Sequence, residues 1–349
     1  MNDTHDTILR QIPGAILPWY GTHARDLPWR RTSRPYEIWL SEVMLQQTRV
    51  EAVRGYYSRF LAALPTIAHL AQVEEDRLLK LWEGLGYYSR AKNLKRAAQV
   101  IQSQYGGQFP RTYGEILSLP GIGPYTAAAI ASICFSLPCP AIDGNVLRVY
   151  ARVLTMEDCV DLPAVKQAVT EALSPLYQDV IPGDLNQALM ELGALICLPN
   201  GAPQCNACPL ASLCLGKAAG RARAYPVKAK KKPRRVEEKT VFILTVEEDS
   251  LAVEKREENG LLAGLWALPN VTGSLTEEEA LALATGWGVH PIELIKSREK
   301  KHIFTHVEWH MRGFYLKCRT KSPAFTWATS QERSNRIALP TAFRQFLEE

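Results

Sequence analysis

Apolar side chains recur at the spacing of an amphipathic helix through the first two thirds of the chain. This pattern predicts helices over 36–57, 70–85, 91–105 and 165–176. Proline and glycine interrupt it at Pro65, Gly84, Gly106 and Pro182, where helices are expected to end. Residues 1 to about 215 therefore read as a helical domain.

The pattern changes after Cys214. Strand-like runs appear at 241–246, 251–253 and 303–316, and helical spacing returns at 276–285 and 341–349. These elements predict a small α+β domain. Ten Lys or Arg residues lie between Lys217 and Lys239, against only two glutamates, with little apolar periodicity over 217–232. Such a run is typical of a solvated linker, and contact with phosphate is the alternative.

A glycine-containing turn lies between two expected helices. Leu-Pro-Gly-Ile-Gly-Pro-Tyr occupies 119–125, and Pro124 suits the first turn of a new helix. Free amides there, beside glycines with no side chain, can hold a phosphate. An ordinary helix–turn–helix corner is the alternative. Asp143 follows eighteen residues after Tyr125, and it could be catalytic or the N-cap of a helix over 146–154.

Four cysteines lie close together in the chain. Cys197, Cys205, Cys208 and Cys214 have the spacing C-x7-C-x2-C-x5-C. Four such thiolates suit tetrahedral zinc or an iron–sulfur cluster, and the spacing alone leaves both open. The other four cysteines are scattered and read as small core residues.

Composition sets broad limits on the class of protein. The chain has 349 residues, 46% hydrophobic and 22% charged, as expected of a globular protein of two to three domains. No apolar run approaches the roughly 18 residues that cross a membrane. The N-terminus lacks the pattern of a secretory signal, so a cytoplasmic protein is expected. The net charge of +5 is too small to establish a nucleic-acid partner.

Several motifs together resemble the endonuclease III-like helix–hairpin–helix glycosylases, and among them the MutY-type adenine DNA glycosylases. The motifs are Leu-Pro-Trp-Arg at 27–30, Ser-Glu-Val-Met-Leu-Gln-Gln-Thr at 41–48, Gly-Leu-Gly-Tyr-Tyr-Ser-Arg at 84–90, the turn at 119–126, Ile-Asp-Gly-Asn at 142–145 and Phe-Thr-His at 304–306. Two departures occur: the first cysteine gap has seven residues where the family usually has six, and Thr305 stands where serine is common.

The resemblance implies a mainly α, two-lobed glycosylase domain over 1–216 that includes an iron–sulfur loop over 197–214. A basic linker would occupy 217–237, and a Nudix-like α+β domain 238–349. The implied cofactor is a [4Fe-4S] cluster bound by the four clustered cysteines. The implied partner is duplex DNA with adenine opposite 8-oxoguanine or guanine, bound by a monomer.

The resemblance also assigns roles in breaking the bond between adenine and its sugar. Glu42 would protonate adenine N7, which needs a raised pKa, and Asp143 would support the cation-like sugar. Asn145 would orient the catalytic groups. Tyr125 stands where strand-nicking relatives carry the lysine that forms a Schiff base, so a monofunctional enzyme is expected.

Further residues are implied to bind the DNA. The adenine must leave the base stack to reach Glu42. Residues implied to line its pocket or fill the vacated duplex are Arg25, Leu27, Trp29, Gln47, Thr48, Leu85, Tyr87 and Gln187. Gly121, Ile122 and Gly123 would contact the DNA backbone. Phe304, Thr305 and His306 would recognise 8-oxoguanine.

Three other functions remain open at this point. A related glycosylase could remove another base, such as mismatched thymine. A DNA-damage binding protein could carry the same fold without catalysis. A Nudix nucleotide hydrolase would need a glutamate-rich magnesium helix, and the Gly-Ser-Leu-Thr-Glu-Glu-Glu-Ala sequence at 273–280 lacks that pattern.

Overall fold

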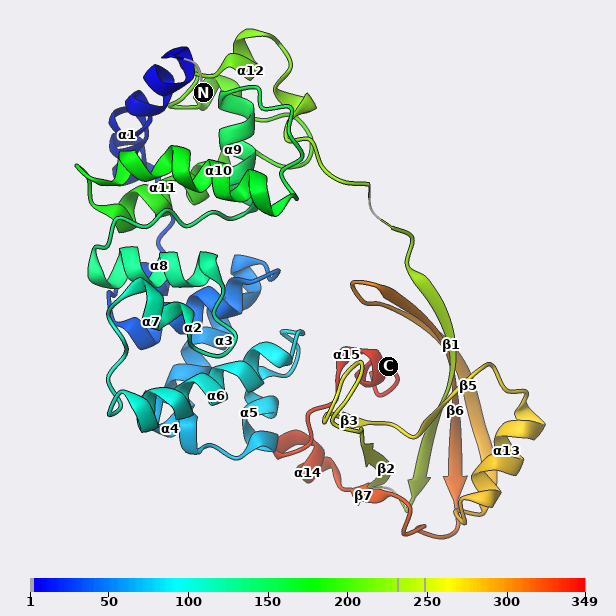
Figure 1. Cartoon of the computed structure of the whole chain (residues 1–349). Helices are drawn as coiled ribbons and strands as arrows, with labels where there is room; N and C mark the ends of the chain where they lie inside the picture. The colour runs from blue at the N-terminus through cyan, green and yellow to red at the C-terminus, as the bar shows by residue number, and fades with distance from the viewer. Residues whose placement is uncertain (1–2, 231, 248, 349) are drawn as a thin grey trace. The chain divides into compact units, whose positions relative to one another are not determined.

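The computed structural model describes residues 3–230, 232–247 and 249–348. Its contacts divide the chain into two compact units (Figure 1). Unit 1 comprises Met1–Gln72 and Asn93–Lys230, and unit 2 comprises Val73–Lys92 and Lys231–Glu349. The short segment 73–92 thus groups with the C-terminal part of the chain. The boundaries expected at 216 and 238 stay predictions, and Lys231 of the expected linker lies outside the described residues.

Unit 1 is helical, as predicted. Its helices are α1 (Asp3–His23), α2 (Pro35–Leu45), α3 (Val50–Ala63), α4 (Ile67–Gln72), most of α6 (Ser89–Gln104), α7 (Tyr113–Leu117), α8 (Pro124–Phe135), α9 (Gly144–Val153), α10 (Pro163–Leu173), α11 (Pro182–Leu195) and α12 (Leu215–Ala218). One lobe buries a core made by α1, α9, α10 and α11. In Figure 1 these helices form one layer of unit 1, and α2, α3, α7 and α8 form another.

Two of the predicted helices are each divided into two. The stretch 36–57 forms α2 and α3 instead of one helix, because the backbone leaves helical geometry at Gln46 and turns left-handed at Gln47, where φ is 56°. The stretch 70–85 divides between α4 and α5 (Glu75–Trp82), with Glu74 extended at the N-cap. In both cases the apolar spacing continues across the break. The break follows from the local backbone conformation, so the hydrophobic pattern does not show it.

Proline begins helices here more often than it ends them. A break is predicted at Pro182, and the boundary there is the start of α11, where the missing amide of proline costs nothing. Pro124 begins α8 as predicted. The helix predicted over 165–176 begins at Pro163 and becomes a short 3-10 turn, Ser174–Tyr177, where Pro175 interrupts it.

Unit 2 is built on a mixed sheet. Within the described residues it has seven strands: β1 (Arg235–Val246), β2 (Ser250–Lys255), β3 (Trp266–Ala267), β4 (Asn270–Thr272), β5 (Pro291–Ile303), β6 (Val307–Cys318) and β7 (Thr326–Ala328). The order along the main path is β3-β2-β1-β6-β5, with β1 and β6 parallel and β5 and β6 antiparallel. The run predicted at 303–316 is therefore the end of β5, a turn and most of β6.

Each face of this sheet has its own apolar core. The side chains of Val241, Ile243, Trp309 and Met311 pack on one face, toward α15 (Thr341–Arg344). The opposite face packs against α13 (Glu277–Gly286), as Figure 1 shows. The helix predicted over 341–349 is shorter than expected, and Glu349 lies outside the described residues. These layers confirm an α+β fold.

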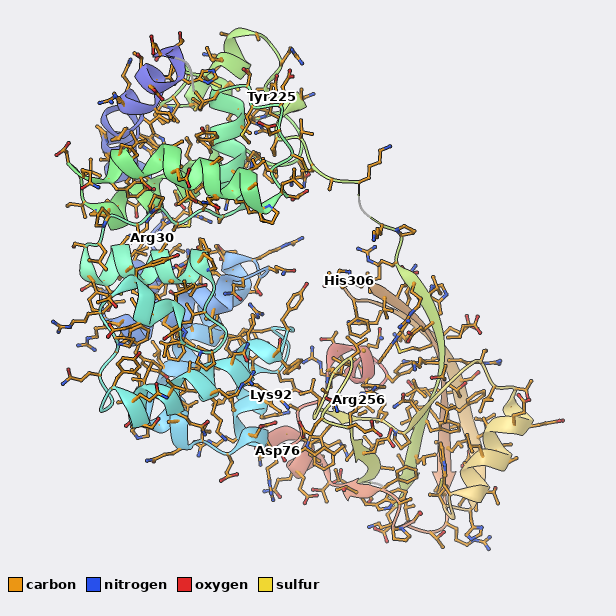
Figure 2. All side chains as sticks on the ribbon, in the orientation of Figure 1. Arg30, Asp76, Lys92, Tyr225, Arg256 and His306 are labelled. Atoms are coloured by element: carbon orange, nitrogen blue, oxygen red, sulfur yellow. The ribbon has the colours of Figure 1, made fainter. Side chains whose placement is uncertain are left out.

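Charged pairs tie segment 73–92 to the rest of unit 2. Lys92 Nζ lies 2.7 Å from Glu75 Oε1 and 3.5 Å from Glu258 Oε2. Asp76 Oδ1 lies 3.0 Å from Lys255 Nζ (Asp76 and Lys92 are labelled in Figure 2). These contacts are consistent with the grouping of the segment with the C-terminal strands.

The first part of the expected linker is packed against unit 1. Tyr225 is buried, and its carbonyl accepts a hydrogen bond of 3.0 Å from Arg152 Nε. The amide of Ala229 donates to Asp161 Oδ2 at 2.9 Å. The chain up to this point therefore belongs to the helical unit. Among the described residues, no helix has the length and apolar character that crossing a bilayer requires.

Candidate active site

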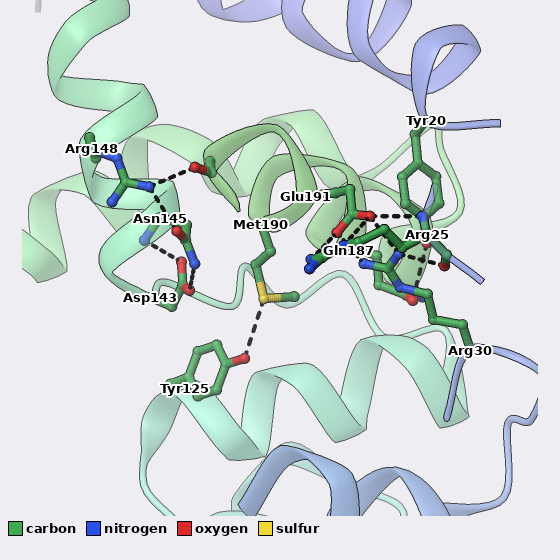
Figure 3. A network of polar contacts seen from close by, with 11 residues as sticks. Tyr20, Arg25, Arg30, Tyr125, Asp143, Asn145, Arg148, Gln187, Met190 and Glu191 are labelled. Atoms are coloured by element: carbon green, nitrogen blue, oxygen red, sulfur yellow. Dashed lines mark hydrogen bonds and ion pairs between the residues drawn. The ribbon is translucent and has the colours of Figure 1, made fainter. Parts of the chain in front are cut away.

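Four helices of unit 1 bring three of the expected catalytic side chains together with Met190, which was not predicted. Glu42 lies on α2, Tyr125 in the first turn of α8, Asp143 at the N-cap of α9, and Met190 on α11 (Figure 3 shows the last three). The Tyr125 hydroxyl donates a hydrogen bond of 2.7 Å to Glu42 Oε2. The structure thus joins residues that are more than 80 positions apart in the sequence.

The residue Glu42 is only 7% exposed. Burial disfavours its charged form and raises its pKa to about 7, the nearby Asp143 charge adds to this, and the Tyr125 hydrogen bond and Arg30 oppose it. The prediction that Glu42 lies in a desolvated environment fits this geometry. At neutral pH the group can both hold and release a proton, as a general acid must.

Asp143 is the N-cap of α9. Its Oδ1 accepts from the backbone amides of Asn145 and Val146, both at 2.8 Å, and its Oδ2 accepts from Asn145 Nδ2 at 2.6 Å. The predicted cap is confirmed. Burial raises the pKa of Asp143, and these hydrogen bonds oppose the rise. The cap fixes the carboxylate in place, so capping and a role in the site are compatible.

Arg148 connects this cap to the cysteine loop. Its Nη2 donates to Asn145 Oδ1 at 2.8 Å, and its Nε donates to the carbonyl of Cys197 at 2.7 Å. One turn later, Arg152 Nη1 lies 3.2 Å from Cys197 Sγ. Both arginines are buried, and neither was singled out from the sequence.

The four predicted metal ligands line one cavity. Cys197, Cys205, Cys208 and Cys214 line it together with apolar side chains of α9 and α11. None forms a disulfide. Four thiols that line one cavity suit zinc or an iron–sulfur cluster.

A buried ion-pair cluster forms the opposite side of the site in Figure 3. Glu191 on α11 is fully buried, and its carboxylate binds Arg25 Nη2 at 2.6 Å and Arg30 Nη2 at 2.7 Å. Burial alone would raise the pKa of Glu191, but the hydrogen bonds from Arg30 and Arg25 outweigh it and hold the pKa at about 2. Arg25 was predicted to line the pocket, whereas Glu191 and the pairing role of Arg30 were missed.

Other predicted pocket residues lie around this cluster. Gln187 Oε1 accepts a hydrogen bond of 3.1 Å from the Tyr20 hydroxyl. Leu27 is buried, and the buried ring of Trp29 packs edge-on against Tyr57 at 5.4 Å. Arg30, which ends the Leu-Pro-Trp-Arg motif, was the available sequence signal for the missed cluster, because a charge beside apolar residues favours a carboxylate partner.

The glycine turn is closed by a hydrogen bond of 3.1 Å from the Ile122 amide to the Leu119 carbonyl, so one of the three predicted phosphate contacts is already engaged. Gly121 has a φ of 76°, and a Cβ there would lie 2.5 Å from the Cβ of Asn93. Gly123 is the extended N-cap of α8, and Ile122 is buried beneath the turn. The turn thus joins α7 and α8 as a helix–hairpin–helix.

The residues expected to wedge the duplex lie in strained turns. Gln47 and Tyr87 both have positive φ, 56° and 48°, which is uncommon for side chains of this size. Thr48 is half-buried, Leu85 is buried and Tyr87 is 45% exposed. Within unit 2 the Tyr87 hydroxyl lies 3.2 Å from Thr305 Oγ1.

The predicted recognition loop joins β5 to β6. The Phe304 ring packs between those of His302 and Trp309, at centroid distances of 4.6 and 4.9 Å. Thr305 and His306 are exposed beside it (His306 is labelled in Figure 2). Their roles, like those of the catalytic and pocket residues, stay predictions.

Comparison with known proteins places both units in families. Residues 40–175 match the HhH-GPD superfamily of base excision DNA repair proteins, and 240–349 match the NUDIX domain. The human adenine DNA glycosylase is 33% identical over 95% of this chain and 72% of its own length. The adenine DNA glycosylase of Buchnera aphidicola subsp. Schizaphis graminum is 31% identical over 95% and 96%.

Solved structures agree with the fold of the helical unit. A thermostable thymine-DNA glycosylase is similar with a TM-score of 0.57 and 29% identity, and the match covers 62% of this chain and all of that one. Endonuclease III in a non-covalent DNA complex is similar with a TM-score of 0.53 at 22% identity, over 62% of this chain and 97% of that one.

The buried ion-pair cluster gives a prediction about stability. Glu191→Gln leaves two arginine charges without their carboxylate, so we expect the free energy of unfolding to fall by about 3 kcal/mol. Because the folded pKa of Glu191 is depressed, its stabilisation is present above pH 4.5 and is lost as the pH falls toward 2.

Chemical denaturation at neutral pH measures this loss. Glu171→Gln, an exposed substitution on α10, is the matched control and should change stability by less than about 0.5 kcal/mol. Equal effects of the two substitutions would contradict the importance of the cluster.

Proposed function

Because this chain belongs to the adenine DNA glycosylases of the HhH-GPD base excision repair superfamily, we propose that it removes adenine mispaired with 8-oxoguanine or guanine and leaves an abasic site. The reaction is hydrolysis of an N-glycosidic bond in DNA. The observation that carries the proposal is the buried carboxyl of Glu42 bonded to Tyr125. A proton donor of this kind suits a purine leaving group, which departs most easily when neutral.

Glu42 acts as the acid and Asp143 as the partner of the sugar. Glu42 gives its proton to adenine N7, so that the base leaves without a negative charge. Asp143, held by the start of α9 and by Asn145, faces the positive charge that develops on the sugar. Two carboxyl groups with different surroundings thus take different roles.

Tyr125 makes the enzyme monofunctional. A phenol cannot form the Schiff base by which a lysine cleaves the strand. The Tyr125 hydroxyl donates a hydrogen bond to Glu42. This contact supports a role for Tyr125 in orienting the acid beside the sugar. The product is then an intact strand with an abasic site.

The adenine pocket is bounded by the ion-pair cluster. Arg25 and Arg30 are held by Glu191, and Gln187 is held by Tyr20, so this wall is fixed before substrate enters. A wall that is already ordered positions the base without further conformational cost. Leu27 and Trp29 supply apolar surface.

Duplex contacts come from the turns. The amides at Gly121 and Gly123 bind a phosphate at the start of α8, and the Ile122 amide, which donates to the Leu119 carbonyl at 3.1 Å, closes the turn. Gln47 with Thr48, and Tyr87 with Leu85, enter the base stack when the adenine is flipped out. The strained backbone at Gln47 and Tyr87 supports this, because such strain is concentrated at ligand-contacting positions.

Unit 2 recognises the opposite base instead of hydrolysing a nucleotide. Phe304, Thr305 and His306 contact 8-oxoguanine, with Phe304 braced by neighbouring rings. Glu279, in the glutamate-rich start of α13, uses its carboxylate to cap Thr276. The sequence at 273–280 also lacks the glutamate pattern of a Nudix magnesium site.

The four cysteines hold a [4Fe-4S] cluster. They line one cavity, and Arg152 beside Cys197 Sγ suits a ligand in its thiolate form. A bound cluster would cross-link the loop 197–214 to the helices that carry the site. Arg148 anchors the same loop through the Cys197 carbonyl.

The central test is single-turnover base release from three duplexes, with adenine opposite 8-oxoguanine, guanine or thymine. We expect release from the first two and strand scission only after hot alkali, because the enzyme leaves an abasic site. A fourth duplex with thymine opposite guanine tests the activity of the thymine-DNA glycosylase that unit 1 resembles. Preference for that duplex would overturn the proposal.

The pH dependence of the single-turnover rate follows from the pKa of Glu42. The rate should fall as the pH rises through about 7, because the acid form of Glu42 is lost. Glu42→Gln should lower the rate by roughly 10²–10⁴-fold. A rate that stays constant from neutral to alkaline pH would count against Glu42 as the acid.

Elemental analysis and visible absorption test the cluster. The purified protein should contain iron and sulfide and show the broad visible absorption of an iron–sulfur protein, and Cys205→Ser should diminish both. Cys159→Ser is the matched control, since Cys159 lies outside the lining of the cavity. Zinc in place of iron would contradict the proposed cofactor.

A further inference from the structure

The thioether of Met190 contacts the Tyr125 hydroxyl. Tyr125 Oη lies 3.3 Å from Met190 Sδ and 2.7 Å from Glu42 Oε2 (the contact with Met190 is drawn in Figure 3). A phenol has one hydrogen, and a thioether sulfur is a weak acceptor. The hydroxyl can therefore donate to the carboxyl group or to the sulfur, but not fully to both.

The protonation state of Glu42 decides between these two acceptors. An ionised carboxylate only accepts, so the Tyr125 hydrogen then points to Glu42. A protonated carboxyl group has a hydrogen of its own to donate, and Tyr125 Oη is the acceptor at 2.7 Å. With the proton on Oε2, which faces Tyr125, the Tyr125 hydrogen turns to another acceptor, and the Met190 sulfur is within reach.

We propose that Met190 is a positioning residue that accepts the Tyr125 hydrogen while Glu42 is protonated, and so stabilises the acid form of the site. The inference rests on the proposed roles of Glu42 and Tyr125. When the base enters, the O–H bond of Glu42 breaks and an N–H bond forms on the base. Tyr125 keeps its own hydrogen and turns from the sulfur to the new carboxylate, so no further proton is needed.

The charges around Glu42 are separate from this contact. Asp143 at the start of α9, Arg30 of the segment Pro28–Arg30, and the thiol of Cys134 on α8 interact with Glu42 besides Tyr125. Replacing Met190 by leucine changes none of these groups. The hydrogen bond from Tyr125 lowers the pKa of Glu42, so losing the alternative acceptor should strengthen that effect.

The test is the pH profile of single-turnover adenine release by Met190→Leu, using adenine opposite 8-oxoguanine. We expect the alkaline fall in rate to move about half a pH unit toward acid. Well above the midpoint the variant should be roughly threefold slower, with an unchanged rate where Glu42 is fully protonated. Met156→Leu, a half-buried methionine of the same unit, is the matched control and should keep the native profile.

Two further variants keep the proposal falsifiable. Met190→Gln offers an amide oxygen as acceptor and should return the profile toward the native one. In a Tyr125→Phe background, Met190→Leu should cause no additional shift, because the hydroxyl is gone. A shift that persists there would overturn the proposal, as would a native profile for Met190→Leu.

Failure of this inference differs from failure of the proposed function. If the native protein releases no adenine from any duplex, the proposed function is wrong. If it releases adenine at a rate that falls at alkaline pH, and Met190→Leu does not shift the pH of that fall, only the proposed role of Met190 is wrong. Thermal melting and duplex binding by each variant verify that it is folded.

Discussion

The burial of one carboxyl group, that of Glu42, is the constraint on which the site depends. Removed from water, this group is most stable as the neutral acid, which is the form that can donate a proton. Arg30 nearby would favour the ionised form, but its charge is already engaged by Glu191. Helices α2 and α11 thus carry two buried glutamates with widely separated pKa values, about 7 for Glu42 and about 2 for Glu191.

Asp143 shows how a helix start can serve as a site. Its carboxylate accepts from two backbone amides and from the Asn145 side chain, so its position is fixed by the same bonds that begin α9. These bonds keep the charged form accessible although burial opposes it. Arg148 extends the arrangement to the cysteine loop through the Cys197 carbonyl. The hydrogen bonds at the start of α9 therefore also fix the Asp143 carboxylate in position before substrate binds.

Features formed by residues close together in the chain could be predicted from the sequence, whereas contacts between distant residues could not. The glycine turn, the Asp143 cap and the four cysteines could be read from residues close together in the chain, and the structure places them as expected. The extent of the helix around Gln47 could not, because a left-handed residue leaves the apolar spacing intact. Glu191 was missed because its partners are 161 and 166 positions away. The contact of Met190 with Tyr125 likewise exists only in the folded chain.

The distance in sequence between Glu191 and its arginines has a consequence for biosynthesis. Arg25 and Arg30 leave the ribosome long before α11 is made, and α1 contributes to a core that α11 completes. In a nascent chain that ends before α11, the two arginines lack the Glu191 carboxylate, and the apolar face of α1 is not packed against α11. Such long-range contacts form slowly and late. Unit 1 is therefore expected to fold only when most of it has been translated, and its nascent form is a natural client for chaperones.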